Sequence, residues 1–278
     1  ATLNKQDVIS LPLLGIMQPW EAAFIIAAVP GIFVALIFLL TIKEPVRRQS
    51  SSDIPLSEKP RLSEVAAFVT RNAGVFAAVF GGVSVLAAVQ FCLGAWVPAH
   101  FIRNLGWTAP EVGYAYGLIF LFCGTGGVIA GVFLSDQLQT RGFSDGHLRA
   151  VMFSAIATLP FVLAFPAVDD GRVAIALLAP VVFFGTMAFG AGPALIPVIC
   201  PSRMRGLLVA VYLLIANIVG QAGGPLIVAL FTDRVFGSPE FVRYSLMVVP
   251  ALLLLIGAML VTLGFRGLRA MNASQAEP

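Results

Sequence analysis

Seven long apolar stretches, none interrupted by a charged residue, alternate with polar segments along most of the chain. A helix needs roughly 20 apolar residues to cross the hydrocarbon core of a bilayer, and each stretch is close to that length or longer. The pattern therefore predicts an all-α, polytopic membrane protein with seven transmembrane helices. The stretches cover residues 22–42, 73–99, 112–134, 150–168, 173–199, 206–231 and 244–265.

Composition supports the same class of protein. Hydrophobic residues make up 59% of the chain and charged residues 11%, with a mean hydropathy of +0.94, whereas soluble domains carry about 25% charged residues. The net charge of +3 reflects basic loops, so it indicates topology rather than nucleic-acid binding. Cys92, Cys123 and Cys200 lie in or beside apolar stretches without metal-ligand spacing, and we expect small buried side chains there.

The basic residues divide unevenly between alternate connections, which predicts the orientation. Loops of the cytoplasmic side carry an excess of Lys and Arg. Five basic residues fall on one side of the predicted topology: Lys5, Arg103, Arg172, Arg234 and Arg243. Twelve fall on the other, which we predict to be cytoplasmic together with the C-terminus: Lys43, Arg47, Arg48, Lys59, Arg61, Arg71, Arg141, Arg149, Arg203, Arg205, Arg266 and Arg269.

The longest polar connection, 43–72, is the natural boundary between two bundles. The start at Ala1, without an initiator Met or signal peptide, indicates part of a longer polypeptide. We expect an extracytoplasmic loop or a helix end over 1–19, a span over 20–42, a cytoplasmic linker over 43–72, a six-helix bundle over 73–268 and a cytoplasmic tail over 269–278.

The second half of the connection, with Leu62, Val65 and Phe68 among charged residues, favours either of two structures. One is a short amphipathic helix on the membrane surface, capped by Ser63, and the other is a solvated linker.

The spans differ in polarity. Those at 22–42, 150–168 and 244–265 are almost wholly aliphatic or aromatic, as expected of helices that face lipid. The other four carry polar residues, glycines and prolines, which are costly in lipid and indicate the walls of a pathway. The polar residues of these four spans include Gln90, Trp96, Tyr114, Tyr116, Thr125, Thr186, Asn217 and Gln221.

Glycine spacing predicts two further features. Gly113 and Gly117, and then Gly127 and Gly131, are four residues apart, so we expect close helix packing at both pairs. The cluster from Gly190 to Pro197 predicts a bend in its span, either at a mobile or cavity-lining point or as a packing feature.

Ionisable groups are sparse where chemistry would need them. The seven stretches contain no Asp, Glu, Lys or Arg, so a proton-coupling group would have to lie elsewhere. His100, at the outer mouth of its span, is either a proton-sensing group or an interfacial anchor. Asp169 and Asp170 fit a turn, and hydrolase and metal motifs are missing, so we predict no enzyme, cofactor or metal site.

Seven spans also raise the possibility of a receptor. A retinal protein needs a lysine in its last helix, but the last lysine of this chain is Lys59. That class is excluded, whereas a non-transporting seven-helix receptor or scaffold remains the alternative to a carrier.

Several motifs resemble those of a known family. TIKEPVRR (41–48) closes a span before the polar linker, and SDQLQTRG (135–142) and PSRMRG (201–206) follow later spans, which resembles the major facilitator superfamily. AWVPAHFIRNLGW (95–107) and LFTDRVFG (230–237) are similar to its Spinster-like branch, including bacterial members.

The resemblance implies a twelve-helix secondary active transporter of the inner membrane, working by alternating access. This chain would hold helix six and helices seven to twelve, and its partner would be the missing N-terminal bundle with helices one to five. The implied substrate is an amphipathic or organic-anion-like solute, lysolipid-like or sphingoid-like in this branch, with proton coupling. Helices seven, eight, ten and eleven would line the cavity, which agrees with the polarity of the spans.

Candidate site residues follow from polarity and from the resemblance together. The family's cytoplasmic latch is only partly kept, because Val132 replaces a glycine and Gln137 replaces an arginine. We expect Asp136, Arg141 and Arg205 to act in gating, although Asp136 also fits a solvated loop acid, and Arg203 and Arg205 fit simple positive-inside anchors. The residues expected to bind substrate are Gln90, Trp96, Thr186, Phe189, Asn217 and Gln221.

Overall fold

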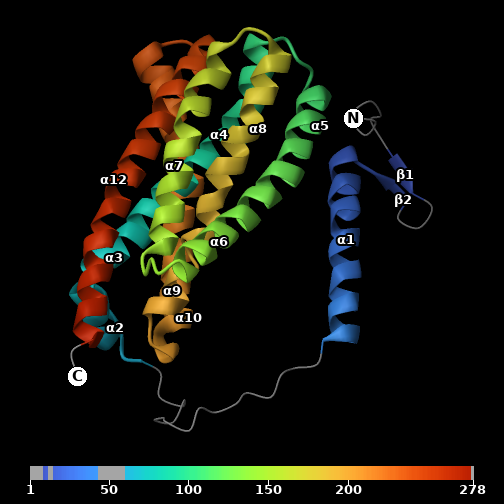
Figure 1. Ribbon diagram of the computed structural model, residues 1–278. Helices are drawn as coiled ribbons and strands as arrows, with labels where there is room; N and C mark the ends of the chain where they lie inside the picture. Colours follow the sequence, from blue (N-terminus) through green and yellow to red (C-terminus); the bar gives the residue numbers. More distant parts are fainter. Residues whose placement is uncertain (1–8, 12–14, 43–59, 277–278) are drawn as a thin grey trace. The chain divides into compact units, whose positions relative to one another are not determined.

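The computed structural model describes residues 9–11, 15–42 and 60–276. The chain forms two compact units, Ala1–Leu56 and Ser57–Pro278, which are described one at a time (Figure 1). Helices make up nearly all of the described residues, as the apolar pattern predicts.

The first unit combines a hairpin with one long helix. Strands β1 (Ile9–Leu11) and β2 (Gly15–Met17) pair antiparallel, where we expected a loop or a helix end. Helix α1 (Pro19–Thr41) begins with proline at its first position and with a capping box, in which the Gln18 backbone N–H donates to Glu21 Oε2 at 2.8 Å.

Seven helical segments of the described chain are long and apolar enough to cross a membrane, which confirms the number read from the sequence. Most extend beyond the charge-free stretches, because helical hydrogen bonding continues into the polar ends. The candidate spans are Phe24–Thr41, Ala73–Asn104, Ala109–Thr140, Gly146–Ala167, Gly171–Ile199, Ser202–Phe236 and Pro239–Arg269.

Six of these spans belong to the second unit, and several contain more than one type of helix. In chain order the elements are α2 (Leu62–Arg71), α3 (Ala73–Phe76), η2 (Ala77–Val83), α4 (Ser84–Asn104), α5 (Ala109–Ile119), η3 (Phe120–Gly124), α6 (Thr125–Thr140), α7 (Gly146–Ala164), η4 (Phe165–Ala167), α8 (Gly171–Ala191), α9 (Leu195–Ile199), α10 (Ser202–Ala216), η5 (Asn217–Gly223), α11 (Gly224–Leu230), η6 (Phe231–Phe236), η7 (Pro239–Phe241) and α12 (Val242–Ala276).

Helix α2 confirms the amphipathic reading of the linker's second half. It buries Val65 against the bundle and leaves Leu62 75% exposed. The predicted Ser63 cap is wrong, because the helix already begins at Leu62 and Arg61, with extended dihedral angles, takes the N-cap position. Ser63 therefore lies within the first turn.

Helix α4 forms the centre of the second unit. It packs against α8, α12 and the span formed by α10, η5 and α11, and 72% of the most apolar part of Ala73–Asn104 is buried. The corresponding fractions for Ala109–Thr140 and Ser202–Phe236 are 17% and 22%. Two of the four spans predicted as pathway walls thus present long faces that other helices of their own unit leave uncovered.

Helices α6 and α8 approach each other at backbone distance. A Cβ atom on Gly127 would collide with the Phe183 carbonyl oxygen, and one on Gly131 with that of Met187. Such contacts are typical of membrane bundles, where association depends on close packing rather than on the hydrophobic effect. The predicted close packing is therefore confirmed at this pair, whereas no described residue would lie within 4 Å of a Cβ atom at Gly113 or Gly117, where close packing stays a prediction.

Interruptions of regular α-helix fall in the same four spans that carry polar residues. The π-helical turns η2, η3, η5 and η6 interrupt three of them. The fourth breaks between α8 and α9 at Gly192–Ala194, which confirms the bend expected between Gly190 and Pro197. By contrast, α7 and α12 continue as α-helix through Pro160 and Pro250.

Replacing Gly127 tests the close approach of α6 and α8. We expect Gly127→Ala to destabilise the protein by about 1–3 kcal/mol, because the added methyl group must push the two backbones apart. Thermal unfolding in detergent measures the change. Gly117→Ala is the matched control, since a Cβ there meets no atom within 4 Å, and equal losses in both variants would contradict the packing argument.

Candidate functional site

Two amides project from the uncovered face of the span that contains η5. Asn217 and Gln221 are both exposed, and side chains four residues apart on a helix lie on the same face. Asn217 Nδ2 donates to the Leu213 carbonyl oxygen at 2.7 Å, which leaves its own oxygen free to accept. Gln221 makes no hydrogen bond to any residue that the structure describes.

Aromatic side chains connect this span to α4 and α8. Trp96 Nε1 donates to the Pro225 carbonyl oxygen at 3.0 Å and so fixes α4 against the start of α11. The Phe91 ring meets Phe189 edge-on, with centroids 6.4 Å apart, and also lies against Gly220. Phe91 was not among the predicted site residues, since one phenylalanine in a phenylalanine-rich membrane chain carries no signal of its own.

Gln90 and Thr186 are buried between helices, with 4% of each residue exposed. Thr186 Oγ1 lies 2.8 Å from the Val182 carbonyl oxygen and 3.0 Å from that of Gly124, so it bridges α8 and η3. Gln90 Nε2 donates to the Val181 carbonyl oxygen at 3.4 Å, and its Oε1 has no partner within the described chain. The structure thus gives these two side chains contacts within the bundle, whereas it exposes Asn217 and Gln221.

The three predicted gating residues form no ion pair within the described ranges. Asp136 and Arg141 are exposed, and Arg205 Nε donates to the Cys200 carbonyl oxygen at 3.1 Å. Their role in gating stays a prediction.

Three ion pairs, none of them involving a predicted gating residue, are present in the described part of the chain. Arg149 meets Asp145 at 2.6 Å, Arg203 meets Glu64 at 3.3 Å and Arg243 meets Asp169 at 2.9 Å. The first was readable from the sequence, because residues four apart on a helix are neighbours. The second joins α2 to α10 across a separation that no local pattern reveals.

His100 is a buried link between α4 and η7. It is fully buried, so the interfacial-anchor interpretation is wrong. Asn104 Nδ2 donates to the Glu240 carbonyl oxygen at 2.8 Å, and Asn104 Oδ1 therefore accepts from His100 Nδ1 at 3.1 Å. With its proton on Nδ1, the neutral imidazole ring can only accept at Nε2, and Nε2 has no hydrogen-bond partner among the described residues.

The turn predicted at Asp169 and Asp170 is confirmed. Asp170 caps α8, where its carboxylate accepts from the backbone N–H groups of Arg172 at 2.8 Å and Val173 at 3.4 Å. Cys92 and Cys200 are buried and Cys123 is half-buried, which agrees with the expectation for the thiols.

Comparison with known proteins identifies the family. Residues 8–225 match the model of the Major Facilitator Superfamily. The chain belongs to this superfamily. Protein spinster of Drosophila melanogaster is 26% identical to this major facilitator chain over 229 residues, which cover 78% of the chain and 36% of the relative. Protein spinster homolog 1 of Mus musculus is 27% identical over 236 residues, which cover 77% of the chain and 43% of the relative.

A third relative of this major facilitator chain is named for the solute it transports. The probable galactarate/D-glucarate transporter of Bacillus subtilis is 24% identical over 225 residues, which cover 72% of the chain and 48% of the relative. The chain thus spans less than half the length of each of these three relatives.

Solved structures share the major facilitator fold. A bacterial homologue of the human lysosomal transporter Spinster, inward-facing and unoccupied, superposes with a TM-score of 0.67 at 20% identity, covering 91% of this chain and 60% of that one. The inward-facing, occupied form of the same homologue superposes with a TM-score of 0.61. The predicted resemblance to the Spinster-like branch and the all-α membrane fold are both confirmed.

The reactivity of Cys200 tests whether its thiol is buried in the loop before α10. Burial raises the pKa of this thiol from 9.0 to about 11, and the Arg205 guanidinium lowers it by a smaller amount. Since the thiolate is the reactive form, we expect maleimide labelling at pH 8 to be about a hundredfold slower than for an ordinary thiol.

Peptide mass spectrometry across a pH series measures this labelling. The rate should keep rising up to about pH 11, and Arg205→Gln should move the rise to higher pH. A plateau below pH 9 would mean that the thiol is not buried as described.

Proposed function

We propose that this chain contributes helix six and the C-terminal six-helix bundle to a secondary active transporter that works by alternating access. Membership of the superfamily supports a carrier over an enzyme. Because the chain covers only part of its relatives, its partner in this proposal is the N-terminal bundle, with helices one to five, of the same protein.

The observation that carries the proposal is the pair of exposed amides on η5. Asn217 and Gln221 lie in the middle of a candidate span, Ser202–Phe236. Amides at that depth are costly in lipid, so such side chains face protein or a water-filled cavity. A solute pathway on this face gives both amides hydrogen-bonding partners.

The uncovered spans have the features expected of walls that move against a second bundle. Both Ala109–Thr140 and Ser202–Phe236 contain π-helical turns, which often occur at functional sites. In rocking-bundle carriers the site lies between the two halves, near the middle of the membrane. Asn217, Gln221, Trp96 and Phe189 form our proposed solute wall, and Gln90 and Thr186 support it from behind.

The proposed solute is amphipathic or organic-anion-like. Similarity to spinster proteins supports a lysolipid-like or sphingoid-like molecule, and similarity to a probable galactarate/D-glucarate transporter supports an organic anion. Uncharged amides beside aromatic rings suit the polar and apolar parts of such molecules. Proton coupling is part of the proposal, with the titrating group on the N-terminal bundle.

The membrane orientation completes the proposal. The arginine-rich ends of the helices face the cytoplasm of a cell whose inner membrane holds the protein, with Asp136, Arg141 and Arg205 as gating residues on that side. A non-transporting receptor or scaffold is the alternative, and it requires no solute flux.

Transport by the full-length protein in proteoliposomes tests the wall. We expect Asn217→Ala combined with Gln221→Ala to lower the initial rate roughly 5- to 150-fold, because the solute loses two hydrogen-bonding groups worth about 0.5–1.5 kcal/mol each. Thr262→Ala is the control, since Thr262 is an exposed polar residue of α12 that lies outside the proposed wall and the latch.

Unchanged transport in the double variant would remove the site assignment. Absence of any flux for lysolipids, sphingoid bases and sugar acids, with or without a pH gradient, would favour the receptor or scaffold. A transport rate that does not change with the pH gradient would contradict proton coupling but not the carrier function.

A further inference from the structure

We propose that the second unit binds an anionic phospholipid in a hollow between α2, α9 and the C-terminal part of α12. None of the residues assigned to the solute wall lines this hollow. The proposal therefore does not depend on the carrier function, and it adds a lipid site at the end of the unit opposite the C-terminal end of α4 and the loop that holds Asp169.

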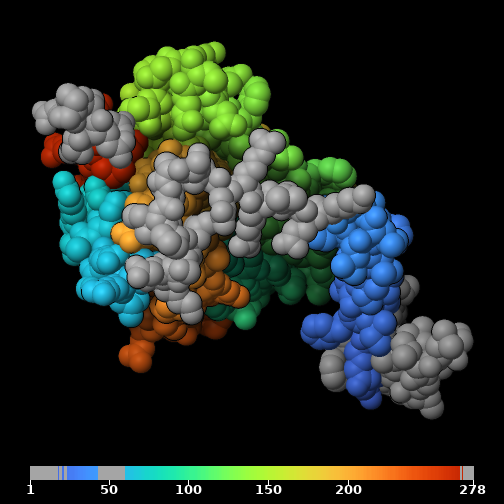
Figure 2. Space-filling model, turned by 90° about the horizontal axis from the view of Figure 1, so that it is seen from below, coloured from blue at the N-terminus to red at the C-terminus, as the bar shows by residue number. Residues whose placement is uncertain are grey.

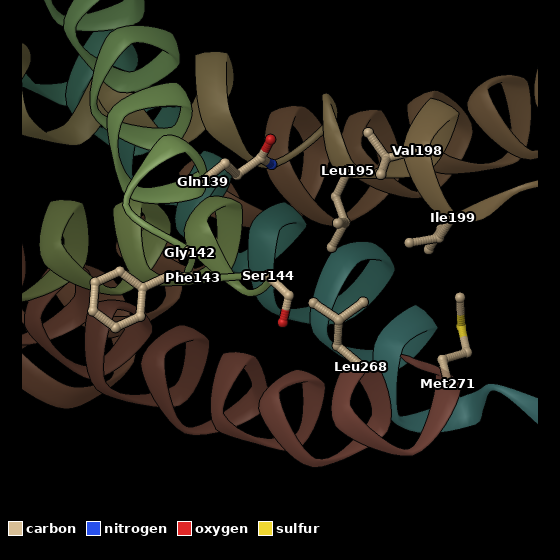
Figure 3. Close-up of a pocket in the computed structure, with 9 residues that line it drawn as sticks. All are labelled: Gln139, Gly142, Phe143, Ser144, Leu195, Val198, Ile199, Leu268 and Met271. Carbon is tan, nitrogen blue, oxygen red and sulfur yellow. The ribbon is translucent and has the colours of Figure 1, made fainter. Parts of the chain in front are cut away.

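The hollow consists of two adjoining cavities of about 440 Å³ each, which share Val198, Ile199 and Met271. Cavities of this size can hold small organic ligands. The first, drawn in Figure 3, is also lined by Gln139, Gly142, Phe143, Ser144, Leu195 and Leu268. The second is also lined by Phe68, Arg71, Asn72, Cys200 and Pro201.

The walls combine an apolar surface with a single cation. In Figure 3, Leu195, Ile199 and Leu268 turn toward the same space, and Ser144 lies beside them. Among the described residues that line the two cavities, Arg71 is the one charged side chain, since burial keeps the Cys200 thiol neutral by raising its pKa to about 11. An apolar surface beside a cation suits a molecule with an acyl chain and an anionic headgroup.

The depth of the hollow fits the headgroup level of a membrane. Its walls lie where four candidate spans begin or end, and this is where polar headgroups meet the hydrocarbon core. Arg71 and Asn72 come directly before one span, and the other wall residues lie at or near the ends of three more. These four spans are Ala73–Asn104, Ala109–Thr140, Gly171–Ile199 and Pro239–Arg269.

The charge around the hollow is complementary to an anionic lipid. This end of the described unit carries three acidic residues, Glu64, Asp136 and Asp145, of which two are already paired with arginines. Basic pockets at such ends attract anionic headgroups. Eight arginines lie at the same end: Arg61, Arg71, Arg141, Arg149, Arg203, Arg205, Arg266 and Arg269.

Helix α2 presents Arg71 from a fixed position. Val65 is buried against the bundle, Phe68 packs edge-on against Phe76, and Glu64 meets Arg203 of α10 at 3.3 Å. Figure 2 views this end and shows the cyan atoms of α2 beside the orange atoms of the α9–α10 region. A lipid bound at Arg71 would therefore fasten α2 to α9 and α12.

Lipid titration of the purified protein in a neutral detergent tests the proposal, with native mass spectrometry as the readout. We expect phosphatidylglycerol to bind more tightly than phosphatidylcholine. Arg71→Gln should weaken phosphatidylglycerol binding about fivefold, the usual effect of one basic residue near an anionic surface. Arg141→Gln is the charge-matched control, because Arg141 is exposed and lines neither cavity.

A second variant tests the apolar part of the site without changing charge. Val198 is 65% exposed, so Val198→Trp should fold normally while it fills the hollow and abolishes selective phosphatidylglycerol binding. Equal weakening by Arg71→Gln and Arg141→Gln would overturn the proposal, as would undiminished binding to Val198→Trp. Protection from thermal unfolding by inorganic phosphate as strong as that by the lipid would also overturn it.

The combined Asn217→Ala and Gln221→Ala variant separates this site from the solute wall. It should bind phosphatidylglycerol like the unchanged protein, whatever its transport rate. A parallel loss of lipid binding in that variant would place both ligands in one site and contradict the proposal.

Discussion

Close backbone contact between helices is the constraint on which the second unit depends. Within a bilayer, apolar side chains gain little by leaving lipid for protein, so helices associate through packing and interhelical hydrogen bonds. Gly127 and Gly131 provide that contact between α6 and α8, and Gly224 does so where α11 meets the Ala88 carbonyl oxygen of α4. Thr186 adds a hydrogen bond between α8 and η3, and Trp96 adds one between α4 and α11.

This mode of packing explains why regular and irregular spans are distributed unevenly. Helices α7 and α12 are continuous and largely aliphatic, and they pack along each other. The spans with π-helical turns or breaks are the ones that carry amides and most of the glycines of the apolar stretches. A helix that must both pack closely on one side and present polar groups on the other departs from even α-helical geometry.

Much of the fold could be predicted from sequence, because membrane crossing imposes a strong length and polarity signal. The seven spans, the break after Gly190 and the packing of Gly127 follow from single-helix patterns. Equal spacing at Gly113 and Gly117 gave the same signal without a contact among the described residues, since spacing does not say whether a neighbouring helix is present. The burial of His100 was likewise invisible, because it depends on Asn104 and on a carbonyl group 136 residues from Asn104 along the chain.

The candidate site was harder to predict than the fold. Polarity selected Asn217, Gln221, Gln90 and Thr186 alike, but the structure exposes the first two and buries the last two in contacts between helices. A sequence lists which side chains can form hydrogen bonds, whereas neighbours in space determine which of those bonds are already made. Phe91 was not selected by polarity, because its place between α4, α8 and η5 is defined only by its contacts with Phe189 and Gly220.

The π-helical turn η5 has a consequence for how this segment tolerates change in length. A π-helical turn accommodates one residue more than an α-helical turn of the same height. Loss of one residue between Asn217 and Gly223 could therefore leave an unbroken α-helix of nearly unchanged length. Because the wider turn and the shorter α-helical segment wind through about the same total angle, side chains on either side of the deletion would keep nearly their present directions, and Gly224 would still meet Ala88 of α4. A deletion in the middle of α12 would instead rotate the flanking side chains by about 100° relative to one another, so length variation among homologues should be more frequent at η5 than there.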